Sequence, residues 1–242
     1  MKIRGVAHRG YPVKYPENTL SSYQAAIDLE FEILELDVHL TKDGVPVLMH
    51  DFKLERTTNG TGQIKDYTLN DLKQLKVSEY ETIPTLEEAL EFTKGKIKVN
   101  VEIKQKGNLY PGIESIVLDT IKKVDVMDQV YASSFDHYSI MRLRKLSPDI
   151  DVSLILSGVT SPNLALMKEF RAKYLAFGVN YITDEVVEDC EKNGITPIAW
   201  AVNSEENIRN MLRYPSVLCT TDQLERFKAI YEEVEGQFTT SK

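Results

Sequence analysis

The sequence predicts a (β/α)8 barrel, and three observations lead to that fold. Short apolar runs typical of buried strands alternate with amphipathic helical patterns along most of the 242 residues. This alternation indicates parallel strands joined by crossover helices. Eight strands are found once the returning arm of a hairpin is set aside, and the chain length is close to the roughly 250 residues typical of such barrels. An open doubly wound sheet fits less well, and no Gly-x-Gly-x-x-Gly motif follows the first strand.

The composition suits one large domain or two small ones, and we expect a single domain that spans residues 1–242. Hydrophobic residues make up 42% of the chain, enough for a sizeable core. The net charge of -8 argues against nucleic acid or an anionic membrane as a partner, but it is compatible with a local basic pocket for a phosphate. Cys190 and Cys219 are expected to be reduced core thiols. The chain shows no signal-length apolar run and no integral membrane segment, which predicts a cytoplasmic protein.

A predicted hairpin at residues 33–51 organises the N-terminal part of the chain. Its first arm alternates apolar and acidic residues, its turn is the favoured pair Asp43-Gly44, and its second arm is apolar. A two-residue loop would place Asp37 directly opposite His50, on the same face as Glu35. A bulge in the turn would shift this register by one residue.

Acidic residues that alternate along a strand are also typical of a solvated face. Two features favour a buried site instead. The intervening residues Leu34, Leu36 and Val38 have the character of core residues, and the partner arm ends in His50-Asp51 rather than in further surface charge.

The other elements follow in order. Residues 3–7 form a strand that ends in His8-Arg9-Gly10, and Asn18 or Thr19 can cap a helix over residues 20–27. Residues 52–83 lose the alternation and are predicted to be an insertion after the second strand, with one short helix within residues 68–75.

After the insertion, strands and helices alternate regularly. The predicted strands are residues 98–103, 130–134, 152–156, 174–179, 196–202 and 217–220. The predicted helices are one that follows a capping box of Thr85 and Glu88, and residues 113–121, 139–146, 164–170, 185–192 and 204–212. The tail after about residue 230 is expected to be frayed.

The active site of such a barrel lies at the carboxyl ends of its strands. The predicted strand ends carry a set of mostly polar residues, namely His8, Arg9, Glu35, Asp37, Glu102, Lys104, Ser133, Ser134, Phe135, Asn180 and Trp200. His50 returns to the same rim through the hairpin. One face of the barrel is therefore predicted to hold the site.

Three carboxylates at this rim, Glu35, Asp37 and Glu102, offer hard oxygen ligands. Such ligands favour Mg²⁺, Ca²⁺ or Mn²⁺ over Zn²⁺, which prefers Cys or several His. The carboxylates would repel one another unless a cation lay among them. The alternative is an ion-pair network in which Arg9 and Lys104 neutralise the cluster.

His8 and His50 are candidates for general acid and general base near neutral pH. Arg9 offers a fork to two phosphate oxygens, and Lys104 offers a second positive charge. With a cation, this set suits phosphodiester cleavage, which requires a neutralised phosphate, an activated nucleophile and a protonated leaving oxygen. The remaining histidines are expected to be structural, namely His39 and His137.

At these residues the sequence resembles the glycerophosphodiester phosphodiesterase family. The similar motifs are His8-Arg9-Gly10, Pro16-Glu17-Asn18-Thr19, Glu35-Leu36-Asp37-Val38, Leu40-Thr41-Lys42-Asp43-Gly44, Val47-Leu48-Met49-His50-Asp51, Glu55-Arg56-Thr57-Thr58-Asn59-Gly60, Val101-Glu102-Ile103-Lys104, Ser133-Ser134-Phe135 and Trp200-Ala201-Val202-Asn203. They follow the family's order and span most of the chain, from residue 3 to about residue 224.

The resemblance implies a barrel with a small insertion after the second strand and metal-dependent hydrolysis of glycerophosphodiesters to sn-glycerol 3-phosphate and an alcohol. By position, it implies Glu35, Asp37 and Glu102 as ligands of one divalent cation and His8 and His50 as the acid–base pair. It also implies substrate contacts, namely Arg9 to the phosphate, and Glu17, Lys104, Phe135 and Trp200. Trp200 resembles an aromatic wall against the glycerol part, although a core role on a barrel strand is also open.

Two other functions stay open. A related phosphodiesterase could act on lysophospholipids or on a teichoic-acid-like polymer, but lipid substrates would favour an exposed apolar lip, and the loops at residues 11–15 and 108–112 show only scattered aromatics. A non-catalytic barrel that binds a phosphorylated ligand would be expected to lose a histidine or a metal carboxylate, and this chain keeps them all. The sequence leaves the cation, the head group and the oligomeric state open.

Overall fold

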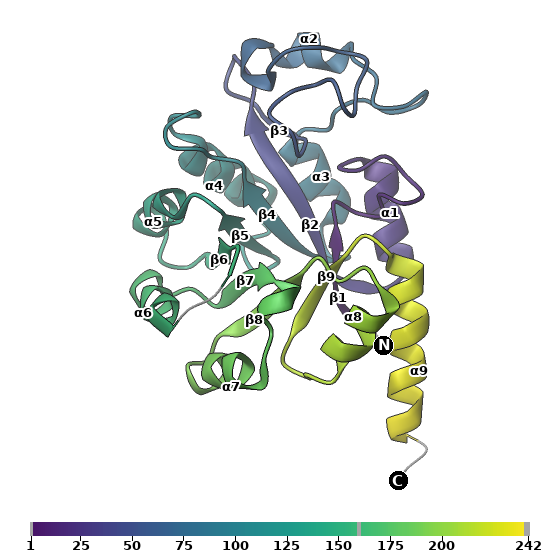
Figure 1. Cartoon of the computed structure of the whole chain (residues 1–242). Coiled ribbons are helices and arrows are strands. Elements are labelled where there is room, and N and C mark those ends of the chain that lie inside the picture. The colour runs from purple at the N-terminus through teal and green to yellow at the C-terminus, as the bar shows by residue number, and fades with distance from the viewer. Residues whose placement is uncertain (1, 159–160, 240–242) are drawn as a thin grey trace.

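The computed structural model of the chain describes residues 2–158 and 161–239. Eight strands form a closed parallel barrel, because β1 pairs with both β9 and β2 at the two ends of the strand order. The barrel strands are β1 (Ile3–His8), β2 (Phe31–Leu40), β4 (Lys98–Ile103), β5 (Val130–Ser134), β6 (Asp151–Leu156), β7 (Tyr174–Gly178), β8 (Thr196–Trp200) and β9 (Leu218–Thr221). The predicted (β/α)8 fold is confirmed (Figure 1).

Helices follow the strands and cover the outside of the barrel (Figure 1). They are α1 (Leu20–Asp28), α3 (Leu86–Thr93), α4 (Ile113–Val124), α5 (His137–Leu146), α6 (Ser161–Phe170), α7 (Asp184–Lys192), α8 (Glu205–Leu212) and α9 (Leu224–Thr239). The predicted caps are present: the Thr19 side chain accepts from the Ser22 N–H, and Thr85 and Glu88 form a capping box. No helix in the described parts of the chain has the length and apolar character needed to cross a bilayer.

The expectation of a frayed tail after residue 230 was wrong, since α9 continues to Thr239. The reason is an apolar stripe at helical spacing. Phe227 is fully buried beside Phe31, and Ile230 and Tyr231 are also buried. Packing of this stripe on the barrel stabilises a helix that the charged composition of the tail obscures.

The barrel strands are packed on both faces, against the helices outside and against one another's side chains inside. One large cluster fills the space between strands and helices, and it includes the two buried, free thiols Cys190 and Cys219. A smaller cluster fills the barrel interior, where Tyr131 stacks on Tyr174 at a centroid distance of 4.3 Å. Along the inward face of β2, apolar Ile33 belongs to this interior cluster and is followed by Glu35 and Asp37 at a spacing of two residues. The interior therefore changes from apolar to acidic toward the carboxyl ends of the strands.

The hairpin forms, but its register differs by one residue from the prediction. β3 (Pro46–Leu48) pairs antiparallel with β2 so that Val38 lies opposite Leu48, and the Asp37 carbonyl accepts from the Met49 N–H. Asp37 is therefore opposite Met49 rather than His50. The cause is a three-residue loop that ends at Gly44, whose φ is 79°. Such a loop adds one residue to the turn and shifts every pair of the ladder.

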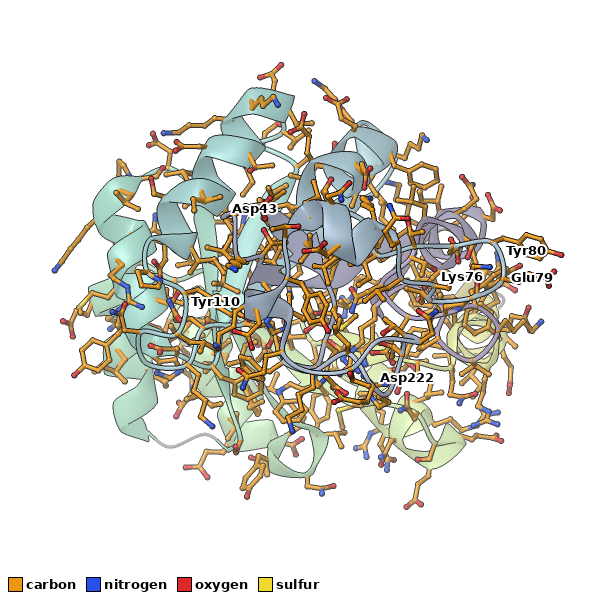
Figure 2. All side chains as sticks on the ribbon, turned by 90° about the horizontal axis from the view of Figure 1, so that it is seen from above. Asp43, Lys76, Glu79, Tyr80, Tyr110 and Asp222 are labelled. Atoms are coloured by element: carbon orange, nitrogen blue, oxygen red, sulfur yellow. The ribbon has the colours of Figure 1, made fainter. Side chains whose placement is uncertain are left out.

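The segment after β3 forms the predicted insertion. It holds a 3-10 turn, η1 (Ile64–Asp66), and one short helix, α2 (Leu69–Lys73), which a capping box at Thr68 begins. Its own small core contains Leu54, Ile64 and Leu72. Figure 1 shows this segment beyond the end of β3, on one side of the barrel, and Figure 2 shows its residues Lys76 and Tyr80 toward the periphery when the molecule is seen from above.

Candidate active site

Three buried carboxylates converge at the rim. One oxygen each from Glu35, Asp37 and Glu102 lies within 4.8 Å of the other two. Their side chains belong to β2 and β4, which pair with Asp37 opposite Glu102. Glu35 Oε1 and Asp37 Oδ1 are buried and receive no hydrogen bond, although the Lys104 ammonium lies 3.3 Å from Asp37 Oδ1. Lys104 also donates to Glu102 Oε1 at 2.7 Å.

The charges of this cluster are only partly balanced. Burial and the nearby Asp37 carboxylate raise the pKa of Glu35 to about 8, and the same causes raise the pKa of Glu102. Burial also raises the pKa of Asp37, but Lys104 and Arg9 lower it more, so the pKa of Asp37 falls below its usual value. A divalent cation would supply the missing positive charge, and the all-oxygen donor set fits a hard cation. The group can therefore hold such an ion.

His8 ends β1 and is oriented by a carboxylate. Its Nδ1 lies 2.7 Å from Asp222 Oδ1, and because a carboxylate only accepts, Nδ1 carries the proton. Asn203 fixes Asp222 in turn, since its Nδ2 donates to Asp222 Oδ2 at 2.6 Å and its Oδ1 accepts from the Asp222 N–H at 2.8 Å. The other ring nitrogen of His8, Nε2, is 4.0 Å from Glu35 Oε2. Burial lowers the pKa of His8, but Asp222 and Glu35 raise it more, so the net pKa is raised.

His50 has the same kind of support. Its Nδ1 donates to Asp51 Oδ1 at 2.7 Å, which leaves Nε2 for the site. Its main-chain carbonyl accepts from His39 Nε2 at 3.2 Å, and the Tyr110 hydroxyl bonds the other ring nitrogen of His39. Burial lowers the pKa of His50, and burial lowers the pKa of His39 to about 4. His39 is therefore a neutral structural residue, as expected, and the other such residue, His137, begins α5 and bonds the Ile155 carbonyl.

The loop after β1 aims Arg9 at the carboxylates. Arg9 adopts a left-handed conformation with φ 57°, and its N–H donates to Glu35 Oε2 at 3.0 Å. Its carbonyl accepts from the Ser22 hydroxyl and from the Asn18 N–H. A Cβ on Gly10, which has φ 85°, would lie 1.9 Å from Ser22 Oγ, so this position requires glycine. These bonds hold a strained backbone in place.

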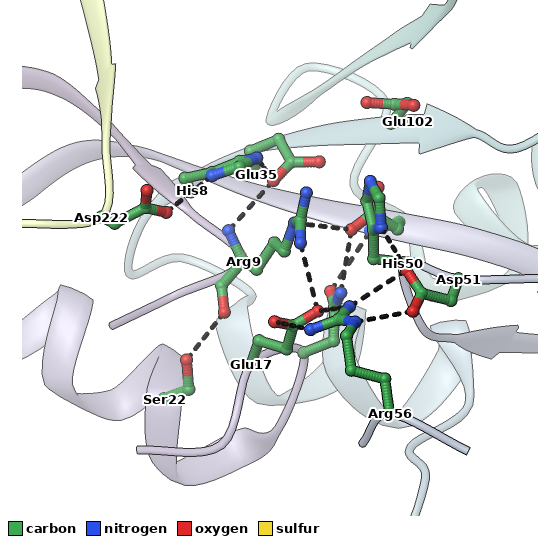
Figure 3. Close-up of polar contacts among 12 residues, drawn as sticks. His8, Arg9, Glu17, Ser22, Glu35, His50, Asp51, Arg56, Glu102 and Asp222 are labelled. Atoms are coloured by element: carbon green, nitrogen blue, oxygen red, sulfur yellow. Dashed lines mark hydrogen bonds and ion pairs between the residues drawn. The ribbon is translucent and has the colours of Figure 1, made fainter. Parts of the chain in front are cut away.

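Glu17 is bound to two arginines. Its Oε1 accepts from Arg9 at 3.2 Å and from Arg56 at 2.7 Å, and its Oε2 accepts from Arg56 at 2.8 Å. Arg9 also lies 3.4 Å from Asp37 through Nε. Figure 3 shows His8 and His50 on either side of Arg9, with Glu17 and Arg56 beneath them.

An aromatic cleft of about 620 Å³ opens beside Glu102 and Lys104. Phe52, Phe135 and Tyr138 line it, and Phe135 and Tyr138 are 49% and 70% exposed. Phe135 meets Trp200 edge-on at a centroid distance of 5.8 Å. The buried Trp200 Nε1 has no hydrogen-bond partner, and the side chain also packs against the barrel interior, so the core role is present and the contact with the glycerol part stays a prediction.

Sequence reasoning missed four residues that support the site, namely Asp51, Arg56, Asn203 and Asp222. Asp222 directly follows the last barrel strand, so the rule that selects polar residues at strand ends could have found it. Arg56 lies in the irregular insertion and ends no strand, so its sequence signal is its place in the motif Glu55-Arg56-Thr57-Thr58-Asn59-Gly60 of the family resemblance.

Three comparisons place the chain among known proteins. Residues 8–226 match the model of the glycerophosphoryl diester phosphodiesterase family. A glycerophosphodiester phosphodiesterase of Caldanaerobacter subterraneus subsp. tengcongensis is 40% identical over 88% of this chain and 91% of its own length. A glycerophosphodiester phosphodiesterase of Bacillus altitudinis is 37% identical over 95% of this chain and 98% of its own length.

A solved structure agrees with these relatives. The structure of an Oleispira antarctica phosphodiesterase in complex with the product sn-glycerol-3-phosphate is 27% identical and superimposes with a TM-score of 0.88, over 94% of this chain and 96% of that one. The chain therefore belongs to the glycerophosphoryl diester phosphodiesterase family and is an enzyme of that class.

Proposed function

We propose that this enzyme hydrolyses glycerophosphodiesters to sn-glycerol 3-phosphate and an alcohol with one divalent cation held by Glu35, Asp37 and Glu102. The buried carboxylate group supports this most strongly, because two of its oxygens receive no hydrogen bond and its charges repel. When bound, the cation would act as a Lewis acid that draws negative charge from the phosphate. Oxygen ligands alone favour Mg²⁺ or Ca²⁺, with Mn²⁺ as a further candidate.

Arg9 and Lys104 are the proposed phosphate contacts. Both lie against the carboxylate group with side chains that are 17% and 10% exposed, so a phosphate seated at the rim meets two partly desolvated positive charges. Glu17 keeps Arg9 in place through its bond to Nη1. Its proposed role in substrate binding is therefore indirect.

His8 and His50 are the proposed acid–base pair. Each has its Nδ1 bound to a carboxylate, so each offers Nε2 to the substrate. One imidazole removes the proton of the attacking hydroxyl, and the other gives a proton to the leaving alcohol oxygen as its bond to phosphorus breaks.

The free glycerol hydroxyl of the substrate is the proposed first nucleophile, which gives a cyclic phosphate that water then opens. A substrate that lacks this hydroxyl yet reacts at the normal rate, with no cyclic product trapped, would exclude this route.

The reaction class is tested by release of glycerol 3-phosphate from glycerophosphocholine, glycerophosphoethanolamine and glycerophosphoglycerol. After EDTA treatment we expect release to stop, and we expect Mg²⁺, Ca²⁺ or Mn²⁺ to restore it. Release that EDTA leaves unchanged would contradict the metal-dependent mechanism. If no ion and no substrate gives release of glycerol 3-phosphate, the proposed activity is contradicted.

The histidine roles have a separate test. His8→Ala and His50→Ala are each expected to lower kcat by about 10²- to 10⁴-fold, the usual contribution of a general acid or base. Circular dichroism of both variants should match the parent, because neither side chain belongs to the apolar core. Rates close to the parent rate in both variants would rule out the two-histidine mechanism.

A related phosphodiesterase that acts on lysophospholipids is the second candidate. The exposed Phe135 and Tyr138 in the cleft supply the apolar lip that the loops of the sequence did not reveal. If an acyl chain lies in this cleft, lysophospholipids should react faster than glycerophosphodiesters, and Phe135→Ser should remove that preference. Equal or lower rates on acylated substrates would leave glycerophosphodiesters as the substrate class.

A further inference from the structure

Arg56 uses its whole guanidinium group to join two carboxylates. Nε donates to Asp51 Oδ2 at 2.6 Å and Nη2 to Asp51 Oδ1 at 3.1 Å. Nη1 donates to Glu17 Oε2 at 2.8 Å and Nη2 to Glu17 Oε1 at 2.7 Å. All four carboxylate oxygens are engaged, and Figure 3 shows Arg56 between Glu17 and Asp51.

Each of these carboxylates supports a residue of the proposed mechanism. Asp51 accepts from His50 Nδ1 at 2.7 Å, and Glu17 accepts from Arg9 Nη1 at 3.2 Å. Because both carboxylates contact the same guanidinium group, they lie close together and would repel each other without a cation between them. Arg56 therefore holds the supports of the imidazole and of the phosphate-binding arginine in one network.

The insertion fixes the backbone that carries Arg56. Leu54 is fully buried in the small core of the insertion, and its carbonyl accepts from both the N–H and the hydroxyl of Thr58. Arg56 lies in the tight turn between these two residues. Lysine could not replace it, because a single ammonium has three donors and lacks the planar fork that spans two carboxylates.

We propose that Arg56 is a positioning residue that couples His50 to Arg9 through Asp51 and Glu17, so that the insertion orders the catalytic rim. This inference rests on the proposed phosphodiesterase function. Arg56 touches neither the carboxylate group nor the substrate position in this role. The Arg56 side chain fixes the positions of His50 Nε2 and of the Arg9 guanidinium group.

Chemical rescue is the first test. Arg56→Ala is expected to lower kcat/KM by about 10²-fold, the cost of misplacing reacting groups by about 1 Å. Guanidinium chloride well below the unfolding concentration should then raise the kcat/KM of this variant at least about tenfold, because the guanidinium ion fills the position of the missing side chain. Sodium chloride at equal ionic strength should not raise it. A fully active Arg56→Ala variant would overturn the proposal.

Arg209 provides a matched control. It also joins two carboxylates, Glu205 and Glu233, and its side chain is 40% exposed compared with 46% for Arg56. It lies on α8, and its two partners lie on α8 and α9 rather than on the strands that carry the carboxylate group. Arg209→Ala should keep the parent kcat/KM with and without guanidinium. An equal loss in this variant would show that the effect of Arg56→Ala is general destabilisation.

A mutant cycle separates positioning from a purely structural role. In a Glu17→Gln, Asp51→Asn background, Arg56→Ala should lower kcat/KM by less than about twofold, because its two partners are already lost. The same 10²-fold loss in that background would overturn the proposed route through these carboxylates.

The network can also be tested by a measurement that does not depend on enzyme turnover, namely the tautomer of His50. The chain has four histidines, so the imidazole nitrogen signals of His50 can be assigned in ¹⁵N spectra. Arg56→Ala should move His50 from the Nδ1-protonated tautomer toward a mixture and leave His39 and His137 unchanged. An unchanged His50 would contradict the proposal even in an active enzyme, whereas a parent protein that hydrolyses no glycerophosphodiester would instead contradict the proposed function.

Discussion

At the scale of single residues, a carboxylate behind each histidine defines the candidate site. Asp222 and Asp51 each accept from an Nδ1 at 2.7 Å, so each imidazole has one tautomer and one orientation. The two rings differ in their surroundings. The net effect raises the pKa of His8, whereas burial lowers that of His50. Such a pair is suited to opposite proton-transfer roles.

The role of Asp222 can be tested through pH dependence. Burial lowers the pKa of His8, but the bond to Asp222 raises it, so Asp222→Asn should lower that pKa. Whether His8 acts as acid or base, the limb of the pH–rate profile that reports it moves to lower pH. We also expect kcat to fall by roughly 10²-fold.

The control for this variant is Asp184→Asn, which removes an exposed carboxylate bonded to the Tyr214 hydroxyl on the outside of the barrel. Its profile should match that of the parent. An unchanged limb in Asp222→Asn would mean that Asp222 does not set the titration of His8.

At the scale of elements, the loop between β1 and α1 depends on a glycine. Gly10→Ala would place a Cβ 2.7 Å from the backbone of Ser22 and 1.9 Å from its hydroxyl, at a φ of 85°. We expect a loss of about 2–4 kcal/mol in the free energy of unfolding from the steric clash and strain. Since Arg9 is the preceding residue, kcat/KM should fall as well. Denaturant unfolding and steady-state kinetics measure the two effects.

Gly95→Ala separates strain from steric clash. Gly95 has φ 73°, and a Cβ added there would meet nothing within 4 Å, so only the left-handed backbone is penalised, by about 1 kcal/mol. Similar losses in the two variants would contradict the close packing of Gly10 on Ser22.

Element patterns were predicted well where one face of an element is buried. The strands at residues 98–103 and 130–134 have the predicted bounds, and the predicted capping box of Thr85 and Glu88 marks the start of α3. The register of the hairpin was predicted incorrectly, because the conformation of Asp43-Gly44 depends on contacts beyond the pair. The Asp43 carboxylate accepts from the Thr41 hydroxyl and from the N–H of Leu69 in the insertion. The anchored Asp43 favours the three-residue loop.

At the scale of the whole molecule, the acidic group links cation binding to stability. The carboxylates of Glu35, Asp37 and Glu102 are buried at 4%, 1% and 9% exposure, and their repulsion opposes folding. A cation at 100 times its Kd should stabilise the folded enzyme by about 2.7 kcal/mol. For a chain of this size, that corresponds to a rise in Tm of roughly 5–10 °C.

Thermal unfolding after EDTA treatment, with Mg²⁺ or Ca²⁺ added back, measures this rise. Asp37→Asn removes one ligand charge and should reduce the rise by more than half. A Tm that no divalent cation changes would contradict cation binding at this position, whatever the activity shows.

The sequence by itself determined the barrel, the rim and most of the candidate site, since strand periodicity and parallel topology bring strand ends together wherever they lie in the chain. It identified His8, Glu35, Asp37 and Glu102 because they stand at such ends. Only the tertiary structure decided the partners of these residues. The bonds from His8 to Asp222 and from Glu17 to Arg56 join residues 214 and 39 positions apart. Such pairs arise from how loops fold over the rim, and no local pattern encodes them.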